Sequence, residues 1–188
     1  AEYIILRLHG MKKLIYSLFG LAIAVGGILG ANYLFVGAAL TKTIKSDSRN
    51  AGIEASAHYK NYISPSTLVF NLKNISEGNS QADVFRVLLQ YAAQMKNKSF
   101  ERVMLAHNGK IKFQMKGEYF KMLGEEFGEQ NPVYTIRTFP EHLSRPDGAQ
   151  AFSTWTGGIL GVLSKQMDDF NKFNKEWYIE DISSSTKK

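Results

Sequence analysis

The sequence contains no cysteine. This absence excludes disulfides, thiolate metal sites, a cysteine nucleophile and a lipid-modified N-terminal cysteine, and it leaves the redox compartment undecided. Recognisable catalytic motifs are also missing: the chain has no HExxH pair, no P-loop, no GxSxG elbow and no Rossmann fingerprint. The four histidines, at positions 9, 58, 107 and 142, lack the paired spacing of a metal site. We therefore expect neither a metal ion nor another cofactor.

A strong charge of either sign is missing as well. The 188 residues carry 23 Lys and Arg against 17 Asp and Glu, a net charge of +6. No basic run is interleaved with stacking aromatic residues, so nucleic acid is not an expected partner. The apolar fraction of 44% and the aromatic fraction of 12% are typical of a globular chain rather than a disordered one.

What the sequence does contain is one long uncharged run, residues 14–40. A bilayer core is spanned by roughly 20 apolar residues in a helix, so this run predicts a transmembrane signal anchor, with the lipid bilayer as its first partner. A cleaved signal peptide is the alternative, with small-residue cleavage sites between 36 and 39. Signal peptides have apolar regions of about 7–15 residues, and these sites lie far beyond Lys13. The length therefore favours the uncleaved anchor.

Positive charges flank the run on both sides, so the positive-inside count nearly ties. Met11, Lys12 and Lys13 resemble a bacterial translation start followed by a positive segment. This pattern makes residues 1–13 an N-terminal tail on the inner side of the inner (plasma) membrane, and residues 1–10 have no expected role in the fold. The chain then crosses once, and its soluble part faces the periplasm or an equivalent space.

Small residues recur every four positions within the run, at Ala22, Gly26 and Gly30. Such a face lets two membrane helices approach closely, where packing drives their association. Helix packing through this face is one interpretation. The other is that Gly and Ala are simply frequent in membrane helices.

The remaining chain predicts one α+β domain at residues 67–178. A polar linker at 41–66 is expected to join it to the anchor, and a disordered tail is expected at 179–188. A β-prone stretch at 67–72 forms the first strand. An amphipathic helix follows, with Ser80 and Asp83 as an acidic variant of the capping box. Its apolar stripe consists of Phe85, Leu88, Leu89, Ala92 and Met95.

The dipeptide at positions 108 and 109, Asn-Gly, predicts a hairpin with a two-residue turn between strands at 102–107 and 110–116. A two-residue loop pairs Met104 with Phe113. The first strand is apolar on both faces and therefore interior, whereas the second alternates with lysine and is expected at an edge. Together with the preceding strand and helix, this hairpin predicts a βαββ start to a mixed sheet of about four strands, covered by two or three helices.

Two further elements are expected to close the domain. Residues 131–139 predict another strand, because they are rich in Val, Tyr, Thr and Ile, which favour strands. Residues 151–177 predict a long amphipathic C-terminal helix, with apolar residues at three- and four-residue steps from Phe152 and Trp155 to Trp177. Glycines at 157, 158 and 161 are unfavourable inside a helix, so the alternative is a helix that begins only after them.

Tyr134, Arg137 and His107 form the best candidate for a polar ligand site. An arginine in an apolar strand must be paired or solvated, so Arg137 is a candidate clamp for a carboxylate or another anion. A structural ion pair is the alternative. His107, beside the hairpin turn, is a candidate acid or base.

The sequence thus favours a non-enzymatic, membrane-anchored envelope component whose soluble domain binds another protein or assembles with copies of itself. This hypothesis rests on the anchor and on the missing catalytic motifs. The alternative is a small periplasmic ligand-binding or hydrolytic domain that uses Arg137, Tyr134 and His107, and one version of it is secreted after signal-peptide cleavage.

Overall fold

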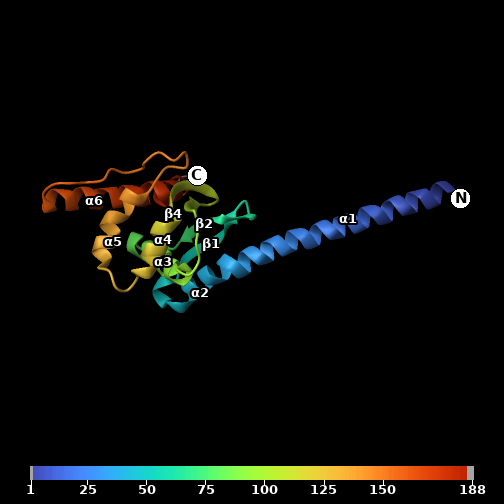
Figure 1. The fold of residues 1–188 in the computed structure, drawn as a ribbon, viewed down its shortest axis with the longest axis horizontal. Helices are drawn as coiled ribbons and strands as arrows, with labels where there is room; N and C mark the ends of the chain where they lie inside the picture. Colours follow the sequence, from blue (N-terminus) through green and yellow to red (C-terminus); the bar gives the residue numbers. More distant parts are fainter. Residues whose placement is uncertain (1, 186–188) are drawn as a thin grey trace.

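The computed structural model describes residues 2–185, in which one helix projects far out of a head that contains the remaining elements (Figure 1). This helix is α1 (Glu2–Asn32). The head is built on a four-stranded mixed sheet with helices packed against it. The expected α+β class, with a mixed four-stranded sheet and a long apolar N-terminal helix, is confirmed.

The N-terminal helix does not end where the head begins. A π-helical turn (Tyr33–Gly37) and α2 (Ala38–Ser46) continue it into the core. Val36 and Leu40 are 0% and 1% exposed and belong to the main hydrophobic core. The carbonyl of Val36 also accepts a hydrogen bond of 3.1 Å from the buried hydroxyl of Tyr91. The end of the apolar run is therefore part of the head.

The strands lie in the order β1 (Ile53–Lys60), β2 (Ser64–Ile75), β3 (Arg102–His107) and β4 (Lys110–Lys116). The β1/β2 and β3/β4 pairs are antiparallel, and the β2/β3 pair is parallel. As predicted, β3 is interior and β4 lies at an edge. The turn between them has φ angles of 48° and 81° at Asn108 and Gly109, which confirms the expected positive-φ pair.

The hairpin register differs from the prediction beyond a bulge between Leu105 and Ala106. Pairs next to the turn are as expected, but Phe113 pairs with Leu105 instead of Met104. A bulge places one extra residue in one strand, and the alternation of apolar and polar residues here does not predict it.

The main core lies between the sheet and the helices α3 (Gln81–Met95) and α4 (Gly117–Glu125). Alternate β2 residues supply one side of this core, because successive strand side chains point to opposite faces. The capping box of Ser80 and Asp83 is confirmed, and the whole predicted apolar stripe of α3 is buried. The β2 residues of the core are Leu68, Phe70 and Leu72.

The expected linker at 41–66 is wrong, because the segment contains most of α2, all of β1 and the start of β2. β1 was not recognised because its buried positions carry Ile53 and the small Ala57 rather than a run of large apolar residues. As an edge strand, it is stabilised by antiparallel pairing with β2 rather than by its own burial.

The expected strand at 131–139 is a helix, α5 (Pro132–Thr138), followed by a 3-10 turn (Phe139–His142). The Asn131 side chain accepts a hydrogen bond of 2.9 Å from the backbone N–H of Val133. Proline occupies the first turn, where its missing N–H has no intrahelical partner to lose. These start signals outweigh the β propensity of the residues that follow.

The C-terminal helix is shorter at its start and longer at its end than expected. α6 (Ile159–Asn174) begins after the first two glycines, so Phe152 and Trp155 lie in the preceding loop. A π-helical turn (Lys175–Ile179) and α7 (Glu180–Ser185) replace the expected disorder after 178. The physical reason is that Ile179 and Ile182 pack against the core and Asp181 pairs with Lys112 of β4. Residues 186–188 of that predicted tail lie outside the described residues.

The close contact between α3 and α4 predicts a strong effect of Gly124→Ala. A Cβ at Gly124 would overlap the carbonyl of Ala92 on α3. We expect a loss of about 1–3 kcal/mol in the free energy of unfolding, because backbone has to move. Urea unfolding in detergent, followed by tryptophan fluorescence, measures it.

The matched control is Gly161→Ala on α6, where an added Cβ has open space. It should leave the stability unchanged or raise it by up to about 1 kcal/mol. Equal midpoints for the two variants would contradict the close packing of α3 on α4.

Candidate functional site

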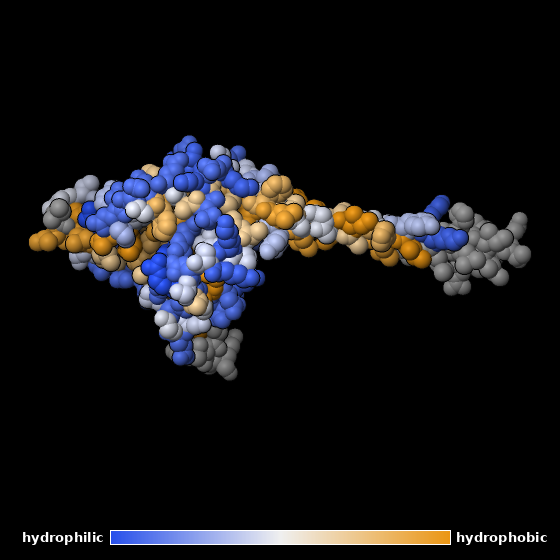
Figure 2. Space-filling view, turned by 90° about the horizontal axis from the view of Figure 1, so that it is seen from below, coloured by the Kyte–Doolittle hydropathy of each residue, from blue (hydrophilic) through white to orange (hydrophobic). Residues whose placement is uncertain are grey.

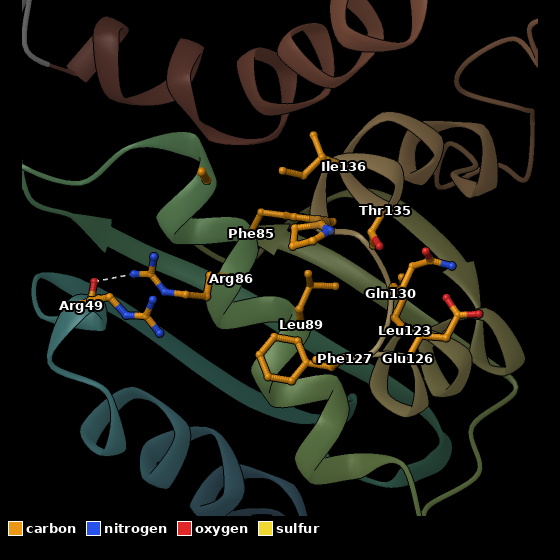
Figure 3. Close-up of a pocket in the computed structure, with 13 residues that line it drawn as sticks. Arg49, Phe85, Arg86, Leu89, Leu123, Glu126, Phe127, Gln130, Thr135 and Ile136 are labelled. Atoms are coloured by element: carbon orange, nitrogen blue, oxygen red, sulfur yellow. Dashed lines mark hydrogen bonds between the residues drawn. The ribbon is translucent and has the colours of Figure 1, made fainter. Parts of the chain in front are cut away.

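A cavity of about 410 Å³ lies between α3, the segment that joins α4 to α5, and α5 (Figure 3). Most of its lining is apolar, and the polar groups are confined to two ends. Arg49 and Arg86 lie at one end, and Glu126, Gln130 and Thr135 lie toward the other. The apolar lining residues are Ala82, Phe85, Leu89, Leu123, Phe127, Pro132 and Ile136.

The floor of the cavity is rigid because its residues also belong to the core. Phe85 and Leu89 lie one helical turn apart on α3 and line the cavity from the same side. The Phe85 ring is 1% exposed and packs edge-on against Phe139 and Phe170, at centroid distances of 4.8 and 5.2 Å. Edge-to-face packing of this kind fixes the ring orientation.

The arginine end of the cavity is a hydrogen-bonded network rather than a free positive patch. The Arg86 guanidinium donates to Asp83 at 2.7 Å and to the Arg49 carbonyl at 2.7 Å, the bond drawn in Figure 3. Arg49 forms an ion pair of 2.7 Å with Asp47. Each guanidinium is thus matched by a carboxylate, so this end is polar without a strong net charge.

A buried amide links this network to α2, the helix that continues α1. Asn50 is 0% exposed; its amide group donates to Gln90 at 2.6 Å and to the Thr43 carbonyl of α2 at 3.1 Å. Its side-chain oxygen accepts a bond of 3.2 Å from Arg86. The cavity therefore shares its supporting bonds with the helix that continues α1.

The two carboxylates of the network are stabilised in their charged forms. Hydrogen bonds from the side chain and backbone of Ser80, and then from Arg86, lower the pKa of Asp83 to about 2. Hydrogen bonds from Arg49 and Gln90 hold the pKa of Asp47 well below its usual range.

Exposed apolar side chains lie at and beside the cavity. Phe127 lines it and is 41% exposed, and Val133 is 56% exposed on the adjoining turn of α5. Met122 and Tyr134 extend the rim toward a smaller cavity of about 230 Å³ that they share with His142. We call Met122, Phe127, Val133 and Tyr134 the apolar rim.

The structure brings together two of the three residues predicted from sequence. Arg137 lies over the ring of Tyr134, with its Cζ 5.2 Å from the ring centroid. Tyr134 also lines the smaller cavity, where His142 stacks on Tyr119 and burial lowers the pKa of His142.

His107 lies elsewhere, at the end of β3. It is 2% exposed, and its Nδ1 lies 3.0 Å from a carboxylate oxygen of Asp181 on α7. The same carboxylate pairs with Lys112 at 2.8 Å. Among the described contacts none joins His107 to Tyr134 or Arg137, so the three do not form one site. His107 instead fastens α7 to the sheet.

The predicted helix-packing face of α1 stays a prediction. Ala22, Gly26 and Gly30 are exposed, and added Cβ atoms at the two glycines would meet open space. The cavity residues, in contrast, were missed as a site. The one sequence signal for them was the Asn131-Pro132 helix start, which marks the beginning of α5.

The ionised state of Asp83 predicts how acid affects stability. Its folded-state pKa lies below the ordinary value of 3.8, so its contribution is present above about pH 4 and is lost as the pH falls toward about 2. Asp83→Asn should therefore flatten the decline of the urea midpoint between about pH 5 and about pH 2.

Asp168→Asn, on the exposed side of α6 and outside the network, is the control and should keep the parent slope. An unchanged slope in Asp83→Asn would show that the network does not hold this carboxylate charged.

The polar side chains of the cavity lining are Arg49, Arg86, Glu126, Gln130 and Thr135. The described lining includes no histidine, and its one hydroxyl group belongs to Thr135. Within residues 2–185, no three His, Asp or Glu side chains gather closely enough to hold a metal ion. Comparisons with protein-family models, with curated proteins and with solved structures find no match for this chain.

Proposed function

We propose that this protein is a single-pass membrane protein whose head binds an apolar segment of a partner protein in the cavity between α3, α4 and α5. The head faces the extracytoplasmic side, with Lys12 and Lys13 on the inner side. The observation that carries the proposal is the apolar cavity with its exposed apolar rim.

The membrane assignment is supported by the surface of α1. One helix in the described part of the chain is long and apolar enough to cross a bilayer. Every large apolar side chain on it from Ile15 to Leu29 is exposed, and so are those of Tyr33, Leu34 and Phe35. Residues 15–35 make a helix of roughly 31 Å, close to the ~30 Å of a bilayer core. Figure 2 shows the apolar surface of this rod beside a mostly hydrophilic head.

An uncleaved anchor is supported by what cleavage would remove. The candidate cleavage sites lie between 36 and 39, so cutting there would separate Asn32 and Val36 from the head. Asn32 bonds the backbone of β1, and Val36 is fully buried. A secreted head would lose part of its core.

A protein partner is supported by the position and nature of the rim. Exposed apolar patches with polar surroundings are typical of protein-binding surfaces. α5 lies at the end of the head opposite to the point where α1 leaves it (Figure 1). The bilayer that holds α1 therefore cannot cover this rim, and an occupant has to come from outside the membrane.

A small apolar ligand is the second candidate. The cavity of about 410 Å³ falls within the ~300–1,000 Å³ of small-molecule sites. In that case the polar groups at its two ends would orient the ligand.

The anchor predicts that the mature protein keeps residues 14–40. Mass spectrometry of the membrane-extracted protein should recover these residues, and sodium carbonate at high pH should leave the protein in the membrane fraction. A mature chain that begins after position 36, found in the soluble fraction, would refute the anchor.

The cavity predicts that a bulky side chain at Thr135 blocks the partner. A photo-crosslinking amino acid in place of Phe127, in cells that express the full chain, should give one discrete protein adduct. Adding Thr135→Trp should reduce this adduct several-fold, because the indole fills the cavity. Ser164→Trp, exposed on α6, should leave it unchanged.

Either of two results would contradict a protein partner. One is an adduct that Thr135→Trp does not reduce. The other is a co-purified small molecule, detected by native mass spectrometry and lost in Thr135→Trp, which would establish the second candidate instead.

A further inference from the structure

The turn between β1 and β2 holds an unusual conformation. Asn61 and Tyr62 both have positive φ, at 53° and 63°. Asparagine adopts this region readily, but a bulky residue such as tyrosine rarely does. Such a conformation persists where surrounding contacts hold it, and it is more frequent at functional positions than elsewhere.

The contacts that hold the turn come from the N-terminal helix. The Asn32 amide group donates to the Tyr62 carbonyl at 2.6 Å, and its oxygen accepts from the Tyr59 N–H at 2.8 Å. The His58 ring stacks on the Tyr62 ring at a centroid distance of 4.5 Å. The turn is therefore fixed to the helix at the level of residue 32.

Despite this ordering, the turn presents apolar groups outward. Ile63 is 70% exposed and Tyr62 is 44% exposed. In Figure 1 the tip of the β1–β2 hairpin points away from the head along the side of α1. We interpret the exposed side chains of this ordered turn as a contact surface.

The position of Asn32 along the N-terminal helix indicates what the turn contacts. The exposed apolar stretch of the helix continues beyond Asn32 to Leu34 and Phe35, which are 74% and 56% exposed. A bilayer that covers these side chains reaches at least as far as the turn bonded to Asn32. Tyr62 and Ile63 then lie at the depth where aromatic and apolar residues meet lipid head groups.

Nearby cations fit the same surface. Lys98, in the loop before β3, lies over the Phe35 ring with its Nζ 5.1 Å from the centroid. Lys60 immediately precedes the turn. Long lysine side chains at this level reach the head groups of anionic lipids, and their stems cover apolar surface.

We propose that Tyr62 and Ile63, flanked by Lys60 and Lys98, insert into the interfacial layer of the same bilayer that α1 crosses. This inference rests on the proposed membrane anchor. The turn is a second point of attachment beside the helix, so the head cannot rotate freely above the membrane. The apolar rim is thereby kept on the side away from the lipid.

The absence of native cysteine allows a direct test with single-cysteine variants of the full chain. Ile63→Cys, Glu129→Cys and Leu21→Cys are labelled with the fluorophore NBD and reconstituted in vesicles of phosphatidylcholine and phosphatidylglycerol. Iodide quenches labels in water, and lipids with a doxyl group near the head group quench labels in the interface. Glu129, exposed in the loop between α4 and α5, is the control on the head, and Leu21 is the control in α1.

We expect iodide quenching at Ile63→Cys to be several-fold weaker than at Glu129→Cys, with strong quenching by doxyl lipid at 63 and not at 129. Equal iodide quenching at 63 and 129, with Leu21→Cys in lipid, would overturn the inference and leave the anchor standing. Protection at 63 that grows with protein density and lacks doxyl quenching would also overturn it, because a second copy then covers the turn. Water exposure at Leu21→Cys would refute the anchor and this inference together.

Discussion

The structure depends on one continuous helical segment that is exposed in its first part and buried in the head in its last part. Its first part, up to Leu29, exposes every large described apolar side chain from Ile15 onward, and its last part buries Val36 and Leu40 in the head. The change takes place within a π-helical turn, Tyr33–Gly37, where one side still carries exposed Leu34 and the other carries Val36. The apolar run therefore changes from exposed to buried within this turn.

Asn32 is the polar residue that makes this junction specific. An amide in the middle of an apolar run is costly unless both its donor and its acceptor are used. Here the amide group donates to Ile28 and Tyr62 carbonyls, and the oxygen accepts from Tyr59. The helix is thereby bonded to the first hairpin of the sheet. The helical segment also reaches the cavity, because Asn50 bonds both the Thr43 carbonyl of α2 and Arg86 in the cavity lining.

The parts of the fold that could be predicted from sequence are those with strong local signals. The uncharged run, the capping box at Ser80 and the Asn108-Gly109 turn each depend on residues close together in the chain, and each was found in place. β1 was missed because small and polar residues can form an edge strand once a neighbour supplies the pairing. α5 was missed because the β propensity of its residues was given more weight than the Asn131-Pro132 start, whose capping hydrogen bond favours the helix. The cavity was beyond prediction, since it exists where Gly124 lets α4 approach α3 and where α5 packs beside them. Of the candidate residues chosen for polarity, His107 instead pairs with Asp181 of α7.

Amide hydrogen exchange across residues 28–46, on the full chain in lipid nanodiscs, tests the central claim most directly. A helix that runs without a break from lipid into the core should show continuous slow exchange through the π-helical turn and α2, as slow as that of α3. A fast-exchanging stretch anywhere between residues 33 and 46 would mean that a flexible linker separates the anchor from the head, and the account of a rigidly held domain would be wrong.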